Sequence, residues 1–208
     1  MEQEQTTKKI FGSDFHWSDP ERVASMSYLC GFCNDKVSSD KGYKINNFSD
    51  GSGNTFHYKG IYICPSCKGP TFFDFNERQF PGKMIGHFVE ELPPQIASLY
   101  TEARNSFSGG AYTGTVLLAR KMLMNIAVHF GAEENKNFIF YVNYLSDEGY
   151  INKSNKGWID YIRLQGNEAT HKIELKSEKE AENILKFIEM LLKTNYEYPS
   201  YVISSEEN

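Results

Sequence analysis

The sequence predicts a protein that is mainly α-helical, with a small β domain preceding its helices. Two observations lead to this fold class. Four cysteines form two C-x2-C pairs between residues 30 and 67, and the segments around the second pair, TFHYKGIYI and TFFDF, alternate apolar and polar residues as β-strands do. From residue 93 onward, apolar residues instead recur at steps of three and four, which is the period of an α-helix.

The composition is that of a folded protein. Hydrophobic residues make up 40% and aromatic residues 14% of the 208-residue chain, which is enough to build a core. No apolar run approaches the about 18–20 residues that cross a bilayer. The N-terminal sequence MEQEQTTKK lacks the hydrophobic segment of a secretory signal. We therefore expect a cytoplasmic protein that does not associate with membranes.

The charge of the chain limits the kinds of partner it can have. The net charge is −5, and acidic residues outnumber basic ones both in residues 1–80 and in residues 81–208. Proteins that coat nucleic acid regardless of sequence neutralise many phosphates with Lys and Arg. This composition therefore disfavours a general DNA-coating protein, while a local pocket for a single phosphate stays compatible with it.

The N-terminal part of the chain is predicted to form an arm and a small β domain. Residues 1–24 are assigned to the arm, in which His16 and Trp17 are expected to pack against the domain that follows. Residues 25–80 are assigned to that domain, with its strands placed around the two cysteine pairs.

The two pairs, CGFC and CPSC, have the spacing of a metal site. A C-x2-C turn directs two thiolates at one ion, and two such turns complete the tetrahedral shell that Zn²⁺ prefers. Two disulfides or a redox pair are the alternatives, but disulfides are rare in the cytosol and a redox motif needs only one pair. We therefore predict a zinc ribbon over residues 25–80. Its metal ligands are Cys30, Cys33, Cys64 and Cys67.

The predicted zinc site holds one ion and is structural. Four cysteines close the coordination shell and leave no position for a reactive water. A domain of this size has little core without its metal, so chelation is expected to unfold it. A zinc-ribbon transcription factor is disfavoured, because the chain has no basic helix and no recognised DNA-reading motif.

The rest of the chain is predicted to be a helical bundle. Residues 81–92 are assigned to a linker, residues 93–196 to the bundle and residues 197–208 to an irregular C-terminal tail. Ser177 begins an S-x-x-E sequence, which predicts a capping box at the start of the last helix. The five helices are expected at about residues 93–108, 111–130, 137–147, 156–172 and 177–196. The residues expected to face the core include Val116, Ala119, Leu123 and Ile126 of the second helix, and Ala181, Ile184, Ile188 and Leu191 of the fifth.

The fourth predicted helix carries a row of polar side chains. Asp160, Arg163, Asn167 and His171 follow one another at steps of three, four and four, so an ideal helix places them in one stripe beside an apolar seam. The stripe is open to two interpretations. It is either an ordinary solvated helix face or a site that handles phosphate.

The helical part of the chain resembles HEPN domains, a helical fold named for nucleotide binding in higher eukaryotes and prokaryotes. The similarity covers about residues 93–195 and is carried by RLQGNEATH at residues 163–171 and by GTVLLARKMLM at residues 114–124. The stretch RLQGNEATH looks more like an uncharacterised HEPN-like family found at the C-termini of bacterial restriction and defence proteins. The spacing between Arg163 and His171 is one residue longer than the usual R-x4-6-H. The residues that match the second motif are Gly114, Leu118, Arg120 and Leu123.

The resemblance implies a metal-independent ribonuclease of a bacterial defence or toxin system. In that case His171 would be the general acid or base at the ribose 2′-hydroxyl or the leaving 5′-oxygen, Arg163 would hold the phosphate, and Asn167 would orient one of them. Arg120 is a second candidate for phosphate binding. The resemblance further implies a homodimer that acts on RNA. The alternative is a noncatalytic module that binds a nucleotide, nucleic acid or protein, with the zinc ribbon as a docking surface for a protein partner.

Overall fold

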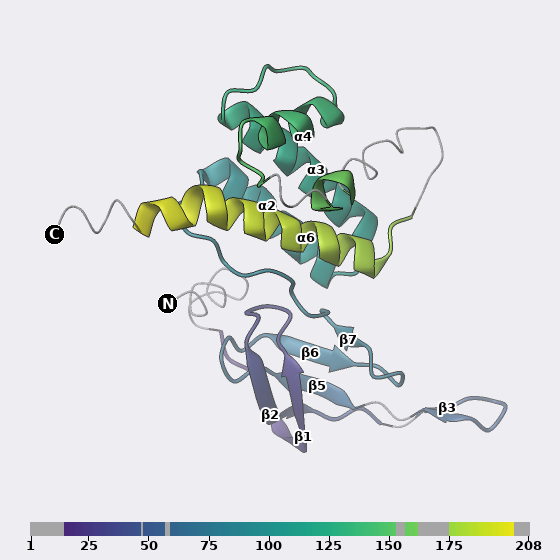
Figure 1. Cartoon of the computed structure of the whole chain (residues 1–208). Coiled ribbons are helices and arrows are strands. Elements are labelled where there is room, and N and C mark those ends of the chain that lie inside the picture. The colour runs from purple at the N-terminus through teal and green to yellow at the C-terminus, as the bar shows by residue number, and fades with distance from the viewer. Residues whose placement is uncertain (1–14, 47, 57–58, 153–156, 162–174, 202–208) are drawn as a thin grey trace. The chain divides into compact units, whose positions relative to one another are not determined.

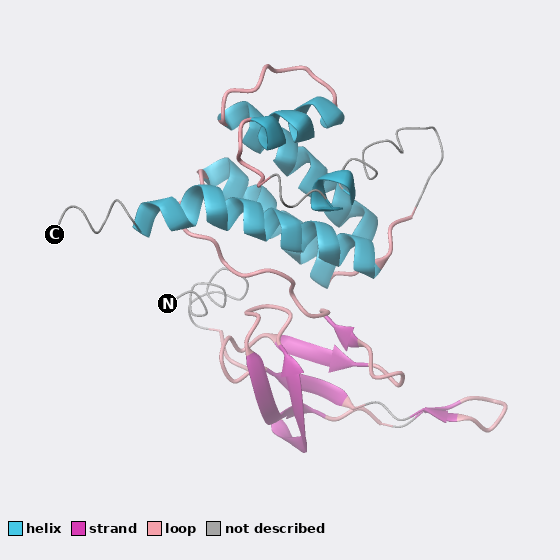
Figure 2. Cartoon of the chain, in the orientation of Figure 1, coloured by secondary structure: helices cyan, strands magenta, loops and turns pink. Residues whose placement is uncertain are grey.

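The chain forms two compact units. The computed structural model describes residues 15–46, 48–56, 59–152, 157–161 and 175–201. The contacts within the chain divide it into Met1–Met84 and Ile85–Asn208. The first unit contains the strands and the second the helices (Figure 2). We call them the β unit and the helical unit and describe each by itself.

The β unit is built on an antiparallel sheet with strand order β1-β2-β5-β6-β7. A separate two-stranded sheet pairs β3 with β4 (Figure 1). The strands of the larger sheet are β1 (Glu21–Leu29), β2 (Lys36–Tyr43), β5 (Gly60–Ile63), β6 (Pro70–Phe73) and β7 (Gln79–Phe80). Those of the smaller sheet are β3 (Phe48–Ser49) and β4 (Thr55–Phe56).

The sheet is larger than the predicted ribbon, so the fold class is mixed α and β rather than mainly α. The first strand also begins at Glu21, inside the predicted arm of residues 1–24. Val23 and Tyr28 are the buried side chains of this strand, and its other residues are partly or fully exposed. The alternation is therefore weak in the sequence, and pairing with β2 decides that the segment is a strand.

Three aromatic rings fill the core of the β unit. Tyr28, Tyr62 and Phe73 meet edge-on, with ring centroids 5.5 to 6.3 Å apart. They pack together with Val23, Val37 and the buried cysteines. The expected packing of the arm is also present, because Trp17 donates from Nε1 to the carbonyl oxygen of Lys68 over 2.8 Å.

The helical unit contains the helices expected from the periodicity. Their bounds are α2 (Pro94–Ser108), α3 (Tyr112–His129), α4 (Phe138–Asp147) and α6 (Glu178–Leu192), the last continued by a π-helical turn, η2 (Lys193–Glu197). Residues 157–161 are also helical, while the remainder of the helix predicted over residues 156–172 lies outside the described residues. The capping box is confirmed, with Ser177 and Glu180 each accepting from the other's backbone N–H.

The predicted apolar faces form the core of this unit. Helix α3 packs against α2, α4 and α6. The core-facing residues named for the second and fifth helices are all buried, with at most 3% of their surface exposed. Across the described ranges of the chain, no helix is both long and apolar enough to cross a membrane.

Residues 85–92, predicted to be a linker, are instead part of the helical unit. We call this segment the strap. Val89 is buried in the helical core. Arg104 of α2 donates from Nε to the carbonyl oxygen of Ile85 over 3.2 Å and from Nη2 to that of Gly86 over 2.9 Å. A polar sequence such as GHFVEE has the composition of a linker, and its place is revealed by contacts in the folded structure.

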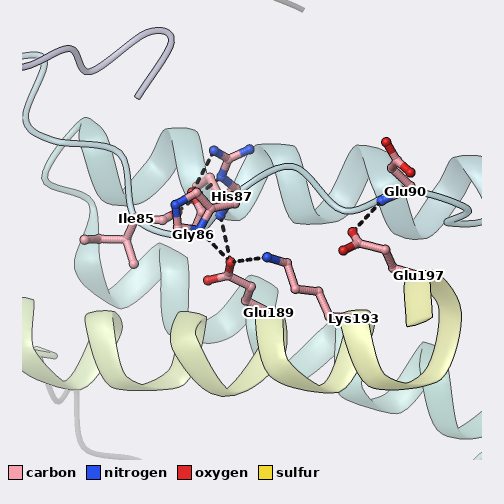
Figure 3. Close-up of polar contacts among 8 residues, drawn as sticks. Ile85, Gly86, His87, Glu90, Glu189, Lys193 and Glu197 are labelled. Atoms are coloured by element: carbon pink, nitrogen blue, oxygen red, sulfur yellow. Dashed lines mark hydrogen bonds and ion pairs between the residues drawn. The ribbon is translucent and has the colours of Figure 1, made fainter. Parts of the chain in front are cut away.

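Two carboxylates of the last helices also hold the strap (Figure 3). Glu189 Oε1 accepts from the backbone N–H of His87 over 3.1 Å and lies 2.8 Å from His87 Nδ1. Lys193 Nζ lies 3.2 Å from the same oxygen. Glu197 Oε2 accepts from the backbone N–H of Glu90 over 3.0 Å. The strap is thus held against the last helices by hydrogen bonds and ion pairs to residues that are distant in the sequence.

The helical structure also extends beyond the predicted end of the bundle. The tail was expected to be irregular from residue 197, but helical turns continue through Tyr201. Asn195 explains part of this order, since its Nδ2 donates to the carbonyl oxygens of Leu191 over 2.8 Å and of Tyr150 over 3.1 Å.

Candidate metal centre

The four cysteines lie on two turns of the same design. The first turn connects β1 to β2 and the second connects β5 to β6. In the first, the backbone N–H of Asn34 donates to the carbonyl oxygen of Cys30 over 2.9 Å, and the N–H of Cys30 donates to that of Asp35 over 2.9 Å. Asn34 has a φ of 63°, in the left-handed region that Asn tolerates better than most residues.

The second turn repeats this pattern. The N–H of Lys68 donates to the carbonyl oxygen of Cys64, and the N–H of Cys64 donates to that of Gly69, both over 2.9 Å. Lys68 has a φ of 62°, close to the value of its counterpart Asn34. Each turn therefore reverses the chain directly after its second cysteine and directs both thiols to one side.

The two turns also pack against each other. A Cβ atom at Gly69 would lie 2.5 Å from the ring of Phe32, so this position of the second turn has room only for glycine. Backbone N–H groups point at two of the sulfurs, from Phe32 to Cys30 Sγ and from Gly69 to Cys67 Sγ, both over 3.4 Å. Such N–H groups favour the thiolate form, which is the form that binds metal.

The sulfur geometry fits one tetrahedral ion. The four Sγ atoms lie within 4.8 Å of one another. The Sγ atoms of Cys30 and Cys67 are 3.6 Å apart, and those of Cys33 and Cys64 are 3.8 Å apart. Four thiolates at about 2.3 Å from a central ion would be about 3.8 Å from each other. These distances are too long for disulfide bonds and match the edges of such a tetrahedron.

The centre is largely enclosed. Cys30, Cys64 and Cys67 are buried, with at most 1% of their surface exposed, whereas Cys33 is half-buried. The predicted ligand set is thus brought together as expected, and it could hold one metal ion.

The thiols affect one another's ionisation. The hydrogen bond with Cys33 lowers the pKa of Cys30, and the bond with Cys30 lowers the pKa of Cys64. Contact with Cys30 raises the pKa values of Cys33 and Cys67. A divalent cation among them would favour the thiolate at all four positions, because each negative charge would face the ion.

The other predicted site residues are placed only in part. Arg163, Asn167 and His171 lie outside the described residues. Arg120 is on α3, and its guanidinium carbon lies 4.6 Å from the ring centroid of Phe138, the first residue of α4. A cation over an aromatic face is a stabilising contact, so Arg120 has a packing role between two helices.

Sequence reasoning missed the acidic side chains that hold the strap. Glu189 lies on α6, and Glu197 ends the π-helical turn η2 eight residues later. Their partners are about 100 residues away in the chain. The sequence signal that could have found them is the occurrence of acids beside an otherwise apolar helix face.

Comparisons with known proteins identify one family. The model of a family described as Domain of unknown function (DUF4145) matches residues 101–207. The match begins within α2 and includes the later helices, whereas the cysteine centre precedes it. No curated protein and no solved structure matches the chain.

Proposed function

This chain belongs to the DUF4145 family, a domain of unknown function, and we propose that it is a metal-independent ribonuclease whose β unit is held together by one structural Zn²⁺. The two parts of this proposal rest on different residues. The zinc assignment depends on the cysteine centre. The ribonuclease assignment depends on the polar row that starts at Asp160.

Zinc is the metal best suited to the cysteine centre, and the β unit is in this proposal a zinc ribbon. Four thiolates in a tetrahedron are typical of structural zinc sites, and the sulfur separations of 3.6 and 3.8 Å support that geometry. When bound, the ion would cross-link the two turns and supply no reactive water, because cysteines fill its shell. Catalysis is therefore assigned to the helical unit.

The polar row of the predicted fourth helix carries the ribonuclease proposal. In the described first turn of this helix, Ile159 is buried and Asp160 is exposed, as the predicted division between apolar seam and polar row requires. The helical period then assigns Arg163, Asn167 and His171 to the row of Asp160. A base, a cation and an amide in one row are the groups that phosphodiester cleavage needs.

The proposed reaction uses the RNA's own 2′-hydroxyl. Its oxygen attacks the adjacent phosphorus as its proton is removed, and the bond from phosphorus to the 5′-oxygen breaks. The leaving oxygen takes up a proton, so the products are a 2′,3′-cyclic phosphate and a 5′-hydroxyl. His171 would transfer a proton at one of these oxygens, Arg163 would neutralise the phosphate, and Asn167 would orient its neighbours.

A homodimer would concentrate these groups. In the HEPN-like proteins that the chain resembles, two copies bring their motifs into one cleft, and a twofold axis would double the positive charge around one phosphate. Size-exclusion chromatography with light scattering tests this part of the proposal. A monomer at micromolar concentration would exclude the shared cleft.

RNA cleavage by the purified protein tests the main proposal. The assay contains EDTA added shortly before the RNA, and it compares the unmodified protein with His171→Ala and with Lys172→Ala, a neighbour outside the polar row. We expect cyclic phosphate ends from the unmodified protein and from Lys172→Ala, and a loss of about 100-fold or more in His171→Ala. Circular dichroism establishes that all three proteins are folded. Equal cleavage by all three would contradict the assignment of His171.

A noncatalytic binding module is the second candidate. The observations in its favour are the net charge of −5 and the Arg163–His171 spacing, which is one residue longer than the usual R-x4-6-H. A protein of this kind would bind RNA or a protein partner through either unit without cleaving it. This candidate would be supported over the ribonuclease if labelled RNA bound in a fluorescence anisotropy assay and neither the unmodified protein nor His171→Ala cleaved it.

The defence or toxin role implied by the resemblance has its own test. Induced expression in a bacterial host is expected to arrest growth when the chain is unmodified and to leave growth unchanged with His171→Ala. If both proteins arrested growth at equal expression, the toxicity would not be caused by the proposed cleavage at His171.

A further inference from the structure

A pocket of about 420 Å³ lies beside the second cysteine turn of the β unit. Its lining includes Phe15 and Trp17, which precede β1, Lys41 of β2, and Pro65 and Lys68 of the second turn. Its volume falls within the about 300–1,000 Å³ of small-molecule sites. It belongs to one unit of the chain and adjoins the cysteine centre, because Cys64 is one of its lining residues.

Trp17 gives the pocket a rigid aromatic wall. Its Nε1 donates to the carbonyl oxygen of Lys68 over 2.8 Å, which fixes the ring against the second turn. Phe15 meets it edge-on with centroids 5.1 Å apart, and Tyr43 lies against it at 5.9 Å. A half-buried ring that is already held in place loses little freedom when a planar ligand stacks on it.

The lining is locally cationic although the whole chain is acidic. Lys41 and Lys68 are both exposed at the pocket. Lys68 Nζ donates to the neutral carbonyl oxygen of Pro65 over 2.7 Å, so this bond leaves its charge uncompensated. Asp40 is the acidic residue of the lining, and its carboxylate is paired with Arg22 over 3.1 Å. Two ammonium groups beside an aromatic wall favour a ligand that combines a flat ring with a negative group.

We infer that this pocket binds one nucleotide, with the base against Trp17 and the phosphate held by Lys41 and Lys68. Stacking needs no particular base, because every base presents a π-face. The ligand is a free nucleotide or one unit of a single strand, since both present the same base and phosphate. The inference deepens the proposed function and rests on it for the choice of RNA as the polymer, but its test measures binding rather than cleavage.

Isothermal titration of the full chain tests this inference. The probes are adenosine 5′-monophosphate, adenosine, inorganic phosphate and a single-stranded adenylate pentamer. We expect the monophosphate to bind about tenfold more tightly than adenosine or phosphate alone, because base and phosphate each contribute. The variants are the double substitution Lys41→Gln with Lys68→Gln, and Lys36→Gln as the matched control. Lys36 is an exposed lysine on the same strand as Lys41 but outside the pocket.

The double variant is expected to lose about tenfold or more in affinity, while Lys36→Gln stays within about twofold of the unmodified protein. Asp40→Asn is expected to tighten binding, because it removes the negative charge beside the phosphate. Tighter binding of the pentamer than of the monophosphate would identify a strand as the ligand, and equal binding a free nucleotide.

The inference would be overturned if neither the monophosphate nor the pentamer bound at about 10 mM. Equal affinity of the double variant and the control variant for the monophosphate would also overturn it. His171→Ala, titrated in parallel, separates the two proposals. If it binds nucleotide normally, the pocket stands whether or not the protein cleaves RNA. If its affinity falls as far as that of the double variant, the nucleotide site is not this pocket.

Discussion

Glu189 shows how one side chain organises a segment that lies far away in the sequence. Its side chain is 15% exposed, and one of its carboxylate oxygens accepts from His87 and contacts Lys193. Burial opposes its ionisation, but the hydrogen bonds from His87 and Lys193 outweigh burial and hold the pKa of Glu189 below its ordinary value. The ionised form is therefore favoured by folding.

This pKa predicts how the stability of the helical unit depends on pH. Because the folded pKa of Glu189 lies below the unfolded one, its contribution is fully present above about pH 4.5 and is lost as the pH falls through the folded value. Glu189→Gln is expected to lower the free energy of unfolding by about 1–2 kcal/mol at pH 7. Urea unfolding at pH 7 and at about pH 3.5 measures both effects, and the difference between the two proteins is expected to shrink at the lower pH.

Glu182 provides the matched control for Glu189. It lies on the same helix with 17% of its side chain exposed, but its ion-pair partners Lys179 and Lys186 are on that helix too. Hydrogen exchange of the amides in residues 85–92 is expected to accelerate in Glu189→Gln and to stay unchanged in Glu182→Gln. Equal exchange in the two variants would show that Glu189 does not hold the strap.

The cysteines differ in how well a substitution can be tolerated. Cys64 is buried, and Cys33 is half-buried. With serine at position 33, water can reach the ion and replace the lost thiolate as a ligand. With serine at position 64, the site is buried and water cannot reach it. We therefore expect Cys33→Ser to retain weakened metal binding and Cys64→Ser to lose it, as measured by metal content per chain after dialysis. The opposite order would contradict the argument from burial.

At the scale of the element, the strap depends on a glycine at its closest approach to α2. Gly86 has a φ of 80°, and a Cβ atom there would lie 2.4 Å from the hydroxyl oxygen of Tyr100. Gly110 has a similar φ of 77°, but a Cβ atom there would meet nothing within 4 Å. The two positions thus share the backbone strain and differ in the steric clash.

Substituting each glycine by alanine separates strain from clash. Gly110→Ala is expected to cost about 1 kcal/mol for the left-handed conformation alone. Gly86→Ala is expected to cost about 1–3 kcal/mol more, because Tyr100 is buried and cannot move freely. Chemical denaturation followed by far-UV circular dichroism compares them. If the two variants lost similar amounts of unfolding free energy, the strap would be able to move away from Tyr100 without an energetic cost.

The start of α6 depends on its capping box. Ser177 Oγ accepts from the N–H of Glu180 over 3.3 Å, and Glu180 Oε2 accepts from the N–H of Ser177 over 2.8 Å. Ser177→Ala is expected to destabilise the helical unit by about 1 kcal/mol. Glu178→Gln, in the same first turn but outside the box, serves as the control in the same denaturation experiment. A loss in the control as large as that in Ser177→Ala would assign the effect to first-turn charge instead.

At the scale of the whole molecule, the two units are expected to respond differently to metal removal. The β unit has a small core of three aromatic rings, two valines and the cysteines, whereas a large apolar core stabilises the helical unit. Metal-binding energy is folding energy in small domains of this kind. A strong chelator is therefore expected to expose the β unit to protease while the helical signal at 222 nm is retained. If the β unit became protease-sensitive and the helical signal at 222 nm was lost at the same time, the two units would not be independent in stability.

The extent to which the sequence predicted the fold varies with the range of the interactions involved. The helices of the helical unit and their buried faces followed from periodicity, and the capping box from four residues. The five-stranded sheet did not, because β2 reads KVSSDKGY and buries only Val37, Ser39 and Gly42, which form no regular apolar alternation. Its identity as a strand depends on pairing with β1 and β5. The polar row at residues 163–171 stays a prediction.

The sequence by itself determined the ligand set of the metal centre, because the C-x2-C spacing directs two thiols to one side within a few residues. It likewise determined the helices, since their hydrogen bonds join residues four apart. Only the tertiary structure decided that residues 85–92 belong to the helical unit and that Trp17 lines a pocket. Those outcomes depend on Glu189, Glu197 and Lys68, which are 51 to 107 positions away from their partners. A contact over such a distance leaves no periodic trace in the sequence, so its formation depends on how the elements pack.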